Sequence, residues 1–281
     1  MSFDHYVRSG QKLLRCGYTT GTCAALAARG AAELLLSGAV PRTLQLVTPK
    51  GWPVQVLPAA CRMEGDAALC GVEKDAGDDC DITDGMTVQA VVSRTDGAGI
   101  LIDGGEGVGR VTRPGLDQPV GAAAINSVPR RMIGEEVRDV CRRFGYTGGL
   151  RVEIRIPGGA EAAQKTFNPK LGIEGGLSVL GTSGVVEPMS EQALVDTIGL
   201  EIRQAAAQSK RLILTPGNYG ADFCTPMVWT LWACRWSSVP ISSGMRWIWR
   251  RPKVSKHCCW WGTWANWSSW RGRDEHPFPL G

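Results

Sequence analysis

Tryptophan is distributed along this chain in a way that divides it in two. Ten of the eleven tryptophans lie between Trp229 and Trp270, and the other is Trp52. The charge changes at the same place, because residues 226–281 carry eight Lys and Arg against two Asp and Glu, whereas residues 1–225 carry 23 against 25. No ordinary fold confines its tryptophan in this way. A normal folded structure is therefore expected only up to about residue 225. The charge balance of residues 1–225 does not argue for a nucleic-acid or membrane partner.

We interpret the tail, residues 226–281, as translation out of frame. Tryptophan has a single codon, so a tryptophan-rich stretch constrains the DNA that encodes it. Read from the third base of the Cys259 codon, Cys259–Trp267 permits the sequence LVGHLGKL, a strand followed by a glycine turn, although most of these codons are permitted rather than forced. The alternative is a genuine tryptophan-rich domain. The out-of-frame interpretation predicts that the tail forms no consistent core and that this polypeptide is poorly soluble or inactive.

The cysteines and the N-terminal segment bear on the cellular compartment. Ten cysteines are scattered without a CxxC pair or the Cys/His spacing of a metal site, which favours reduced thiols in a cytoplasmic protein and no metal. Met1 to Leu14 carries charges and no apolar core, so no signal peptide is expected. No apolar run reaches membrane-spanning length.

Residues 1–160 predict an α+β domain. The run Thr22–Leu36 is rich in Ala and Leu and predicts a helix, which Thr20 or Thr22 caps and Gly38 ends. The other expected elements are a hairpin at 44–57, strands at 67–72, 87–93 and 100–103, a helix at 134–145 and a strand at 150–156.

Residues 161–225 predict the start of a parallel sheet. Gly176–Leu180 is expected to be a strand, Gly181–Gly184 a sharp turn, and Ser190 the cap of an amphipathic helix, before a second strand at Arg211–Thr215. This strand–helix–strand pattern predicts an incomplete Rossmann-like domain. The expected fold class is therefore α/β with two domains, 1–160 and 161–225, followed by the aberrant tail 226–281.

The turn between the expected strand and helix is a candidate cofactor site. A glycine turn at the carboxyl end of a parallel strand lets a ligand approach the backbone, and the following helix start offers free N–H groups. Both features suit an adenosyl cofactor, although a plain tight turn is the alternative. The acidic residue that usually holds a ribose is missing, and Asn218 could supply hydrogen bonds instead. The candidate cofactor-binding residues are Gly181, Thr182, Ser183, Gly184, Pro216, Gly217, Asn218 and Tyr219.

Two further segments could carry chemistry. Lys74–Asp81 packs four carboxylates and a lysine into eight residues, but it lacks EF-hand spacing. It is either a polar patch that contacts a substrate or a solvated turn. The loop Gly104–Arg110 could close on an anionic substrate or cradle a phosphate, or it is simply a long hairpin loop; it is not a Walker motif. Histidine occurs at only three positions, two of them in the tail, so residues 1–225 offer almost no histidine for acid–base catalysis.

Seven strings in this chain occur in an order and spacing that resemble the cobalt-precorrin-5B (C-1)-methyltransferase family. The similarity runs from about Leu14 to Gly220. Cys80 and Asp84 depart from it, at positions where Pro and His are expected. The strings are Gly17–Ala25, Lys74–Asp79, Gly104–Arg110, Ala124–Arg130, Asn168–Gly176, Leu180–Ser190 and Leu214–Gly220.

The resemblance implies an enzyme that uses S-adenosylmethionine to methylate C-1 of cobalt-precorrin-5B, giving cobalt-precorrin-6A in anaerobic cobalamin biosynthesis. It implies a small-molecule substrate, a cobalt-bearing tetrapyrrole whose carboxylates suit the nearby arginines, Arg113 and Arg131 included. No catalytic residue is assigned. The alternatives are a small-molecule phosphotransferase that uses the Gly-rich loop and a non-catalytic tetrapyrrole-binding protein. The expected substrate contacts are Thr19, Thr20, Thr22, Lys74, Asp75, Asp78, Asp79, Glu106, Arg110 and Arg130.

Overall fold

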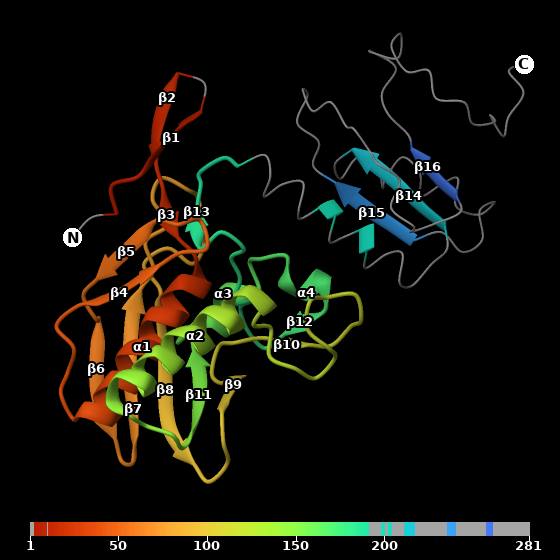
Figure 1. The fold of residues 1–281 in the computed structure, drawn as a ribbon. Coiled ribbons are helices and arrows are strands. Elements are labelled where there is room, and N and C mark those ends of the chain that lie inside the picture. The colour runs from red at the N-terminus through yellow and green to blue at the C-terminus, as the bar shows by residue number, and fades with distance from the viewer. Residues whose placement is uncertain are drawn as a thin grey trace, which may run out of the picture. The chain divides into compact units, whose positions relative to one another are not determined.

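The computed structural model describes residues 3–9, 11–190, 198–199, 202–203, 211–216, 235–239 and 257–260 (Figure 1). The chain divides into two compact units, Met1–Thr197 and Ile198–Gly281. The domain boundary expected near residue 160 lies inside the first unit, because short strands between residues 173 and 186 pair with strands of the preceding segment.

A five-stranded mixed sheet forms the centre of the first unit. In space the strands follow the order β6-β7-β8-β11-β9, and all neighbours are antiparallel except β11 and β9. Along β8 the side chains of Val88, Ala90 and Val92 are buried at alternate positions, because successive residues of a strand face opposite sides of the sheet. Four of these five strands were expected from the sequence and are thus confirmed, whereas the fifth, β6, was not anticipated. Their bounds are β6 (Ala60–Glu64), β7 (Ala67–Glu73), β8 (Thr87–Thr95), β9 (Ile100–Gly104) and β11 (Gly149–Arg155).

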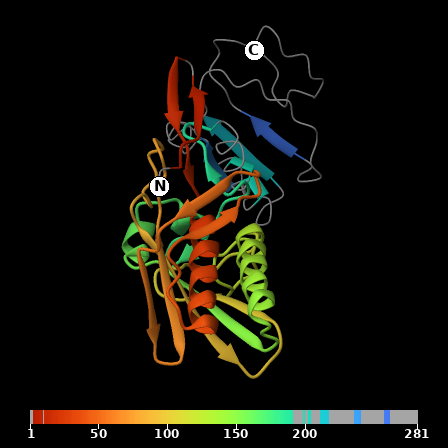
Figure 2. The same cartoon turned by 60° about the vertical axis from the view of Figure 1, so that its left-hand side comes forward.

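Two long helices, α1 (Thr20–Ser37) and α2 (Ser127–Phe144), lie side by side on one face of this sheet (Figure 2). Helix α1 presents mainly alanine to the sheet, which lets the two approach closely, and it ends at Gly38 in the left-handed conformation, as expected. Among the helices that the structure describes, none is long and apolar enough to cross a membrane.

Both helix starts differ from the prediction. Thr19, rather than Thr20 or Thr22, caps α1, and its hydroxyl oxygen accepts the Thr22 N–H. Helix α2 begins at Ser127, ahead of the expected Gly134, because Pro129 falls in the first turn, where no helical partner for its missing N–H is required.

Short hairpins and bridges surround the central layers. The expected hairpin is confirmed, with β4 (Leu44–Val47) antiparallel to β5 (Pro53–Val56). A second hairpin, β1 (Tyr6–Ser9) with β2 (Lys12–Arg15), was not anticipated. The remaining elements of the first unit are β3 (Gly17–Tyr18), β10 (Arg110–Val111), α3 (Gly159–Ala163), α4 (Asn168–Leu171), β12 (Ile173–Glu174) and β13 (Val185–Val186).

The segment after β12 corrects the strand expected at Gly176–Leu180, whereas most of the helix expected after Ser190 lies outside the described residues. Leu177 and Val179 form isolated parallel bridges with Val108 and Ile125 rather than a strand of a new sheet. After the turn the chain enters β13, which pairs antiparallel with β3, where Val185 is opposite Tyr18. Val185 and Tyr18 are both buried in the main core, and this burial draws the segment back onto the first unit.

The second unit contains a three-stranded parallel sheet in the order β15-β14-β16. Its strands are β14 (Arg211–Pro216), β15 (Arg235–Val239) and β16 (His257–Trp260). Strand β14 matches the second strand expected from the sequence. Strands β15 and β16 belong to the tail, most of which lies outside the described residues. Ile198 and Ile202, expected on one helix face, are both helical and both buried.

Candidate functional site

Several of the predicted site residues lie at the start of α1. The Thr22 hydroxyl donates to the Gly184 carbonyl at 2.6 Å, and the Thr20 hydroxyl accepts the Leu180 N–H at 3.1 Å. The Gly21 N–H donates to the Leu180 carbonyl at 3.0 Å. Thr19, Thr20 and Thr22 are all buried. The helix start is therefore closed by the loop that follows Leu180, and these first-turn donors are used within the chain.

The loop Gly181–Gly184 was expected to open toward a cofactor, and it packs on Thr19 instead. Gly181 has a φ of 135°, and a Cβ there would clash with the Thr19 side chain. Gly184 has a φ of 76°, and a Cβ would lie 2.9 Å from Pro49 and Thr48. Both glycines are thus explained by a close approach of chain segments. Thr182 is exposed and Ser183 half-buried, and the Ser183 hydroxyl donates to the Val185 carbonyl at 3.0 Å.

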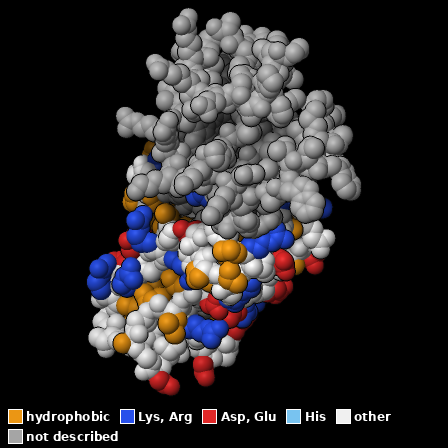
Figure 3. Space-filling model, turned by 90° about the vertical axis from the view of Figure 1, so that its right-hand side faces the viewer, with side chains coloured by type: hydrophobic (Ala, Val, Ile, Leu, Met, Phe, Trp, Pro, Cys, Tyr) orange, Lys and Arg blue, Asp and Glu red, His pale blue; other side chains and the backbone are white. Residues whose placement is uncertain are grey.

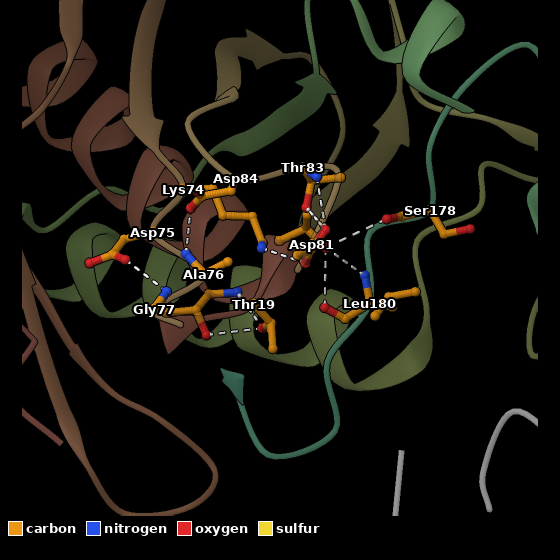
Figure 4. A network of polar contacts seen from close by, with 12 residues as sticks. Thr19, Lys74, Asp75, Ala76, Gly77, Asp81, Thr83, Asp84, Ser178 and Leu180 are labelled. Atoms are coloured by element: carbon orange, nitrogen blue, oxygen red, sulfur yellow. Dashed lines mark hydrogen bonds and ion pairs between the residues drawn. The ribbon is translucent and has the colours of Figure 1, made fainter. Parts of the chain in front are cut away.

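The acidic turn after β7 is held by a buried lysine (Figure 4). The Lys74 side chain is 1% exposed, and its Nζ lies 2.6 Å from Oδ2 of Asp81. The other Asp81 oxygen accepts the N–H and hydroxyl of Thr83 at 2.8 and 2.7 Å. Asp84, which departs from the family pattern, accepts the Ala76 N–H at 2.8 Å. The turn is therefore an ordered polar structure rather than a freely solvated loop.

Arg15 binds the same turn from the end of β2. Its guanidinium contacts both oxygens of Asp75, at 2.6 and 2.7 Å, and its backbone N–H donates to Asp78 at 2.7 Å. Sequence reasoning missed Arg15, because it lies 60 residues from Asp75. It also left Asp81 out of the site. The signal that could have indicated Asp81 was Lys74, because a lysine that becomes buried requires a paired carboxylate.

The carboxyl groups of the turn have distinct acidities. The hydrogen bond from Arg15 holds the pKa of Asp75 below its usual value. Burial works to raise the pKa of Asp81, but Lys74 and Thr83 outweigh it, so this pKa is lowered. Burial raises the pKa of Asp79, opposed by a hydrogen bond from the Met189 backbone. Of these three carboxyls, Asp79 is thus the one that takes up a proton most readily.

Arg110 and Arg130 form a second group, around Asp103. The Arg110 guanidinium contacts both oxygens of Asp103, at 2.7 and 3.1 Å, and the Gly104 carbonyl at 2.6 Å. Arg130 donates to the carbonyls of Ile125, Ile102 and Ala123, and burial lowers its pKa. Glu106 is exposed. Both arginines, expected to bind substrate carboxylates, are used to fix the loop and the start of α2.

The two remaining arginines also have contacts within the chain. Arg113 donates to the Lys170 carbonyl at 3.4 Å, and Arg131 lies 3.9 Å from Glu135 one turn along α2. On the face shown in Figure 3, basic and acidic side chains of the described part are interspersed. Within the described ranges, no group of three or more His, Cys, Asp or Glu side chains is placed to hold a metal ion.

A small hollow of about 150 Å³ lies between β4 and α2. It is smaller than the roughly 300 Å³ at which ligand pockets begin. None of the predicted cofactor residues lines it. Pro216 ends β14, whereas Gly217, Asn218 and Tyr219 lie outside the described residues. The lining residues are Leu46, Val47, Pro49, Arg131, Met132, Glu135 and Glu136.

Comparison with known proteins identifies the family. Residues 7–188 match the model of the CbiD family. The chain belongs to the CbiD family. It resembles a crystal structure of the cobalamin biosynthesis protein (cbiD) from Archaeoglobus fulgidus, with 32% identity and a TM-score of 0.51, covering 78% of this chain and 69% of that one. The resemblance inferred from the seven strings is therefore confirmed, and so is a mixed α/β fold.

Two curated CbiD relatives carry the name cobalt-precorrin-5B C(1)-methyltransferase. That of Ruminiclostridium cellulolyticum is 47% identical over 221 residues, covering 78% of this chain and 57% of the relative. That of Treponema denticola is 48% identical over 228 residues, covering 78% of this chain and 61% of the relative. The chain thus spans about three fifths of the length of the curated relatives it matches.

Proposed function

We propose that the intact protein is an S-adenosylmethionine-dependent methyltransferase that acts at C-1 of cobalt-precorrin-5B and gives cobalt-precorrin-6A. The observation that carries this proposal is the identity of 47–48% over more than 220 residues with relatives of that name. Identity at this level over most of the chain, with the site strings in order, supports a shared reaction. The proposal places the protein in cobalamin biosynthesis, with a cobalt-bearing tetrapyrrole as its small-molecule substrate.

The cofactor site is proposed for the second unit rather than the first. The expected cradle at Gly181–Gly184 does not fit an adenosyl group, because Gly181 packs on Thr19, Gly184 packs on Thr48 and Pro49, and the neighbouring N–H groups of α1 are used within the chain. Strand β14, in contrast, is the second strand expected from the sequence, lies before the tail and ends at Pro216. Ligands of parallel α/β sheets bind at the carboxyl ends of the strands. Gly217, Asn218 and Tyr219 follow that end and remain the proposed contacts.

The first unit is proposed to bind the precorrin. Residues of the acidic turn and the exposed Thr182 come from segments that the fold brings to the start of α1. Asp75, Asp78 and Asp79 remain the proposed substrate contacts of the acidic turn. Transfer breaks the sulfur–methyl bond of the sulfonium and forms a carbon–carbon bond at C-1. This chain contributes alignment of the two reactants to that step, which is the main requirement of such a displacement.

The incomplete Rossmann-like character of the second unit and the out-of-frame origin of the tail belong to the same proposal. The expected second strand, β14, supports the first idea. The confinement of tryptophan to residues 229–270, with Trp52 the one exception, supports the second. The out-of-frame origin is decided by resequencing the gene between the codons of Tyr219 and Gly281. A confirmed frame error would supply the corrected chain on which activity is measured.

Calorimetric titration tests the function directly. S-adenosylmethionine is titrated into the chain encoded by the resequenced gene, followed by an assay of methyl transfer to cobalt-precorrin-5B. We expect binding of one cofactor per chain and formation of a methylated product. Binding of ATP without S-adenosylmethionine would favour the phosphotransferase alternative. Binding of the tetrapyrrole without S-adenosylmethionine would favour a non-catalytic binding protein, and either result would overturn the proposal.

A further inference from the structure

Cys61 and Cys70 are directly opposite each other on neighbouring antiparallel strands of the central sheet. The register of β6 and β7 pairs Cys61 with Cys70, next to the pairs Ala60–Gly71 and Arg62–Leu69. Opposite residues in an antiparallel pair have Cα atoms about 4.5–5.5 Å apart, which is within the range that a disulfide spans. Both cysteines are free thiols in the structure. The backbone therefore holds them at bridging distance before any bond forms.

Both side chains face α1. A Cβ added at Gly30 of that helix would lie 2.6 Å from Sγ of Cys70, so the glycine leaves room for this sulfur. Cys70 is fully buried beneath the helix. Cys61 lies on β6, the edge strand of the sheet in Figure 1, and is half-buried. One thiol is thus open to small molecules, and the other is protected behind it.

Cys61, the more accessible of the two thiols, is also the more acidic. A hydrogen bond from the Cys70 thiol lowers the pKa of Cys61, although burial and the charge of Glu33 oppose it. The same hydrogen bond and burial raise the pKa of Cys70. The thiolate is the attacking form of cysteine. The accessible Cys61 is therefore the first nucleophile, and the buried Cys70 is in place to react with whatever Cys61 becomes.

We propose that Cys61 and Cys70 form an oxidisable dithiol that a low-molecular-weight disulfide, such as glutathione disulfide, converts into an intrachain disulfide. The Cys61 thiolate attacks one sulfur of glutathione disulfide, forming a mixed disulfide and releasing one glutathione. Cys70 then gives up its proton and attacks the Cys61 sulfur, forming the cross-strand bond and releasing the second glutathione. The two protein thiols lose two electrons and two protons, and the oxidant gains both as two glutathione molecules.

Peptide mapping of the full 281-residue chain tests this proposal. The folded protein is incubated with glutathione disulfide, alkylated and digested with trypsin, which cleaves after Arg62, between the two cysteines. We expect the peptides Gly51–Arg62 and Met63–Lys74 to be joined by a bond that dithiothreitol reverses. The same treatment in concentrated urea should lose this selectivity, because the strands no longer align the thiols. Absence of the joined peptides from the folded protein, or equal cross-linking among many cysteines, overturns the proposal.

Two substitutions separate the roles of the thiols. In Cys70→Ser the mixed disulfide has no resolving thiol, so we expect a stable glutathione adduct on Cys61. The matched control is Cys80→Ser, which removes an exposed cysteine outside the pair and should leave the joined peptides unchanged. Far-ultraviolet circular dichroism checks that each variant is folded. A glutathione adduct on Cys70 rather than Cys61 in the wild-type chain would contradict the assigned order.

Discussion

Lys74 is the residue of the candidate site whose charge depends most on its ion-pair partner. Its ammonium is buried, and its ion pair with the partly exposed Asp81 satisfies it. Removing one member of a buried pair costs far more than the pair contributes, because the other charge is left without a partner in a poor solvent for ions. The two members are not equivalent, since Asp81 is 27% exposed and can gain water where Lys74 cannot.

The first prediction follows from this asymmetry. Asp81→Asn leaves the Lys74 ammonium without a carboxylate and should lower the free energy of unfolding by about 3–5 kcal/mol. Lys74→Met removes the buried charge and leaves a carboxylate that reaches solvent, so it should cost less. Urea denaturation of both variants measures the difference. If Lys74→Met proved the more destabilising of the two, the assignment of Lys74 as the desolvated partner would be wrong.

A second prediction concerns acid stability. The pKa of Asp75 is lowered in the folded chain, so its contribution to stability is present above the ordinary value of 3.8 and is lost as the pH falls through the lower folded value. Arg15→Met removes the first cause of that shift. The loss of stability between about pH 5 and about pH 2 should therefore be shallower in this variant.

The matched control for Arg15→Met is Arg62→Met. Arg62 is 58% exposed and pairs with Glu64 on the edge strand, where water screens the interaction. Its removal should leave the acid dependence close to that of the parent chain. An unchanged acid dependence in Arg15→Met would show that the pair with Asp75 does not set it.

Residue types in the candidate site were predictable, and their partners were not. Lys74 with several nearby aspartates was recognisable as a polar cluster from eight consecutive residues. Which aspartate is paired was not, because Arg15, 60 residues away, takes Asp75 and leaves Asp81 to Lys74. Arg110 and Arg130 show the same limit. Their charge suggested an anionic ligand, whereas the fold directs them to Asp103 and to backbone carbonyls.

At the scale of elements, the junction of β3, α1 and the loop Gly181–Gly184 is the most constrained feature. Segments more than 160 residues apart in sequence exchange hydrogen bonds there. Gly184 and Gly175 offer a matched test of that constraint, since both have positive φ, 76° and 80°. A Cβ at Gly175 meets nothing within 4 Å, whereas one at Gly184 meets Thr48 and Pro49 at 2.9 Å.

The third prediction compares alanine at these two glycines. Gly175→Ala should cost only the backbone strain of a left-handed residue, about 1–2 kcal/mol. Gly184→Ala adds a clash that separates the loop from α1, so it should cost at least about 1 kcal/mol more. Urea denaturation measures both variants. Equal costs would show that the loop is not packed on the helix as closely as the geometry indicates.

Local patterns located α1 and four of the five strands of the central sheet, but they missed β6 and failed where tertiary contacts determine the structure. The strand expected at Gly176–Leu180 is replaced by isolated bridges of Leu177 and Val179. The short strand β13 forms instead because Val185 is buried against the main core, opposite Tyr18. No periodicity in two residues could have indicated that pairing. Parallel bridges of Leu177 and Val179 are likewise set by partners 54 or more residues away.

At the scale of the whole molecule, the first unit has a hydrophobic core that does not depend on the tail. The main core of the first unit is built from residues between Phe3 and Val185, so its burial is contained within that range. The change in composition near residue 225 falls inside the second unit and leaves the first untouched. An error in the tail would therefore remove cofactor binding from the proposed enzyme without unfolding the part that holds the acidic turn.

The last prediction compares two truncations of this chain. The fragment 1–197 keeps β13 and the loop Gly181–Gly184, so it should unfold cooperatively with a midpoint close to that of the first unit in the full chain. The fragment 1–180 loses the partners of Thr22 and Tyr18 and exposes the start of α1. Each lost buried hydrogen bond costs about 1–3 kcal/mol, so this fragment should unfold at markedly lower urea. Circular dichroism at 222 nm follows both transitions, and equal midpoints would mean that residues 181–190 do not complete the core.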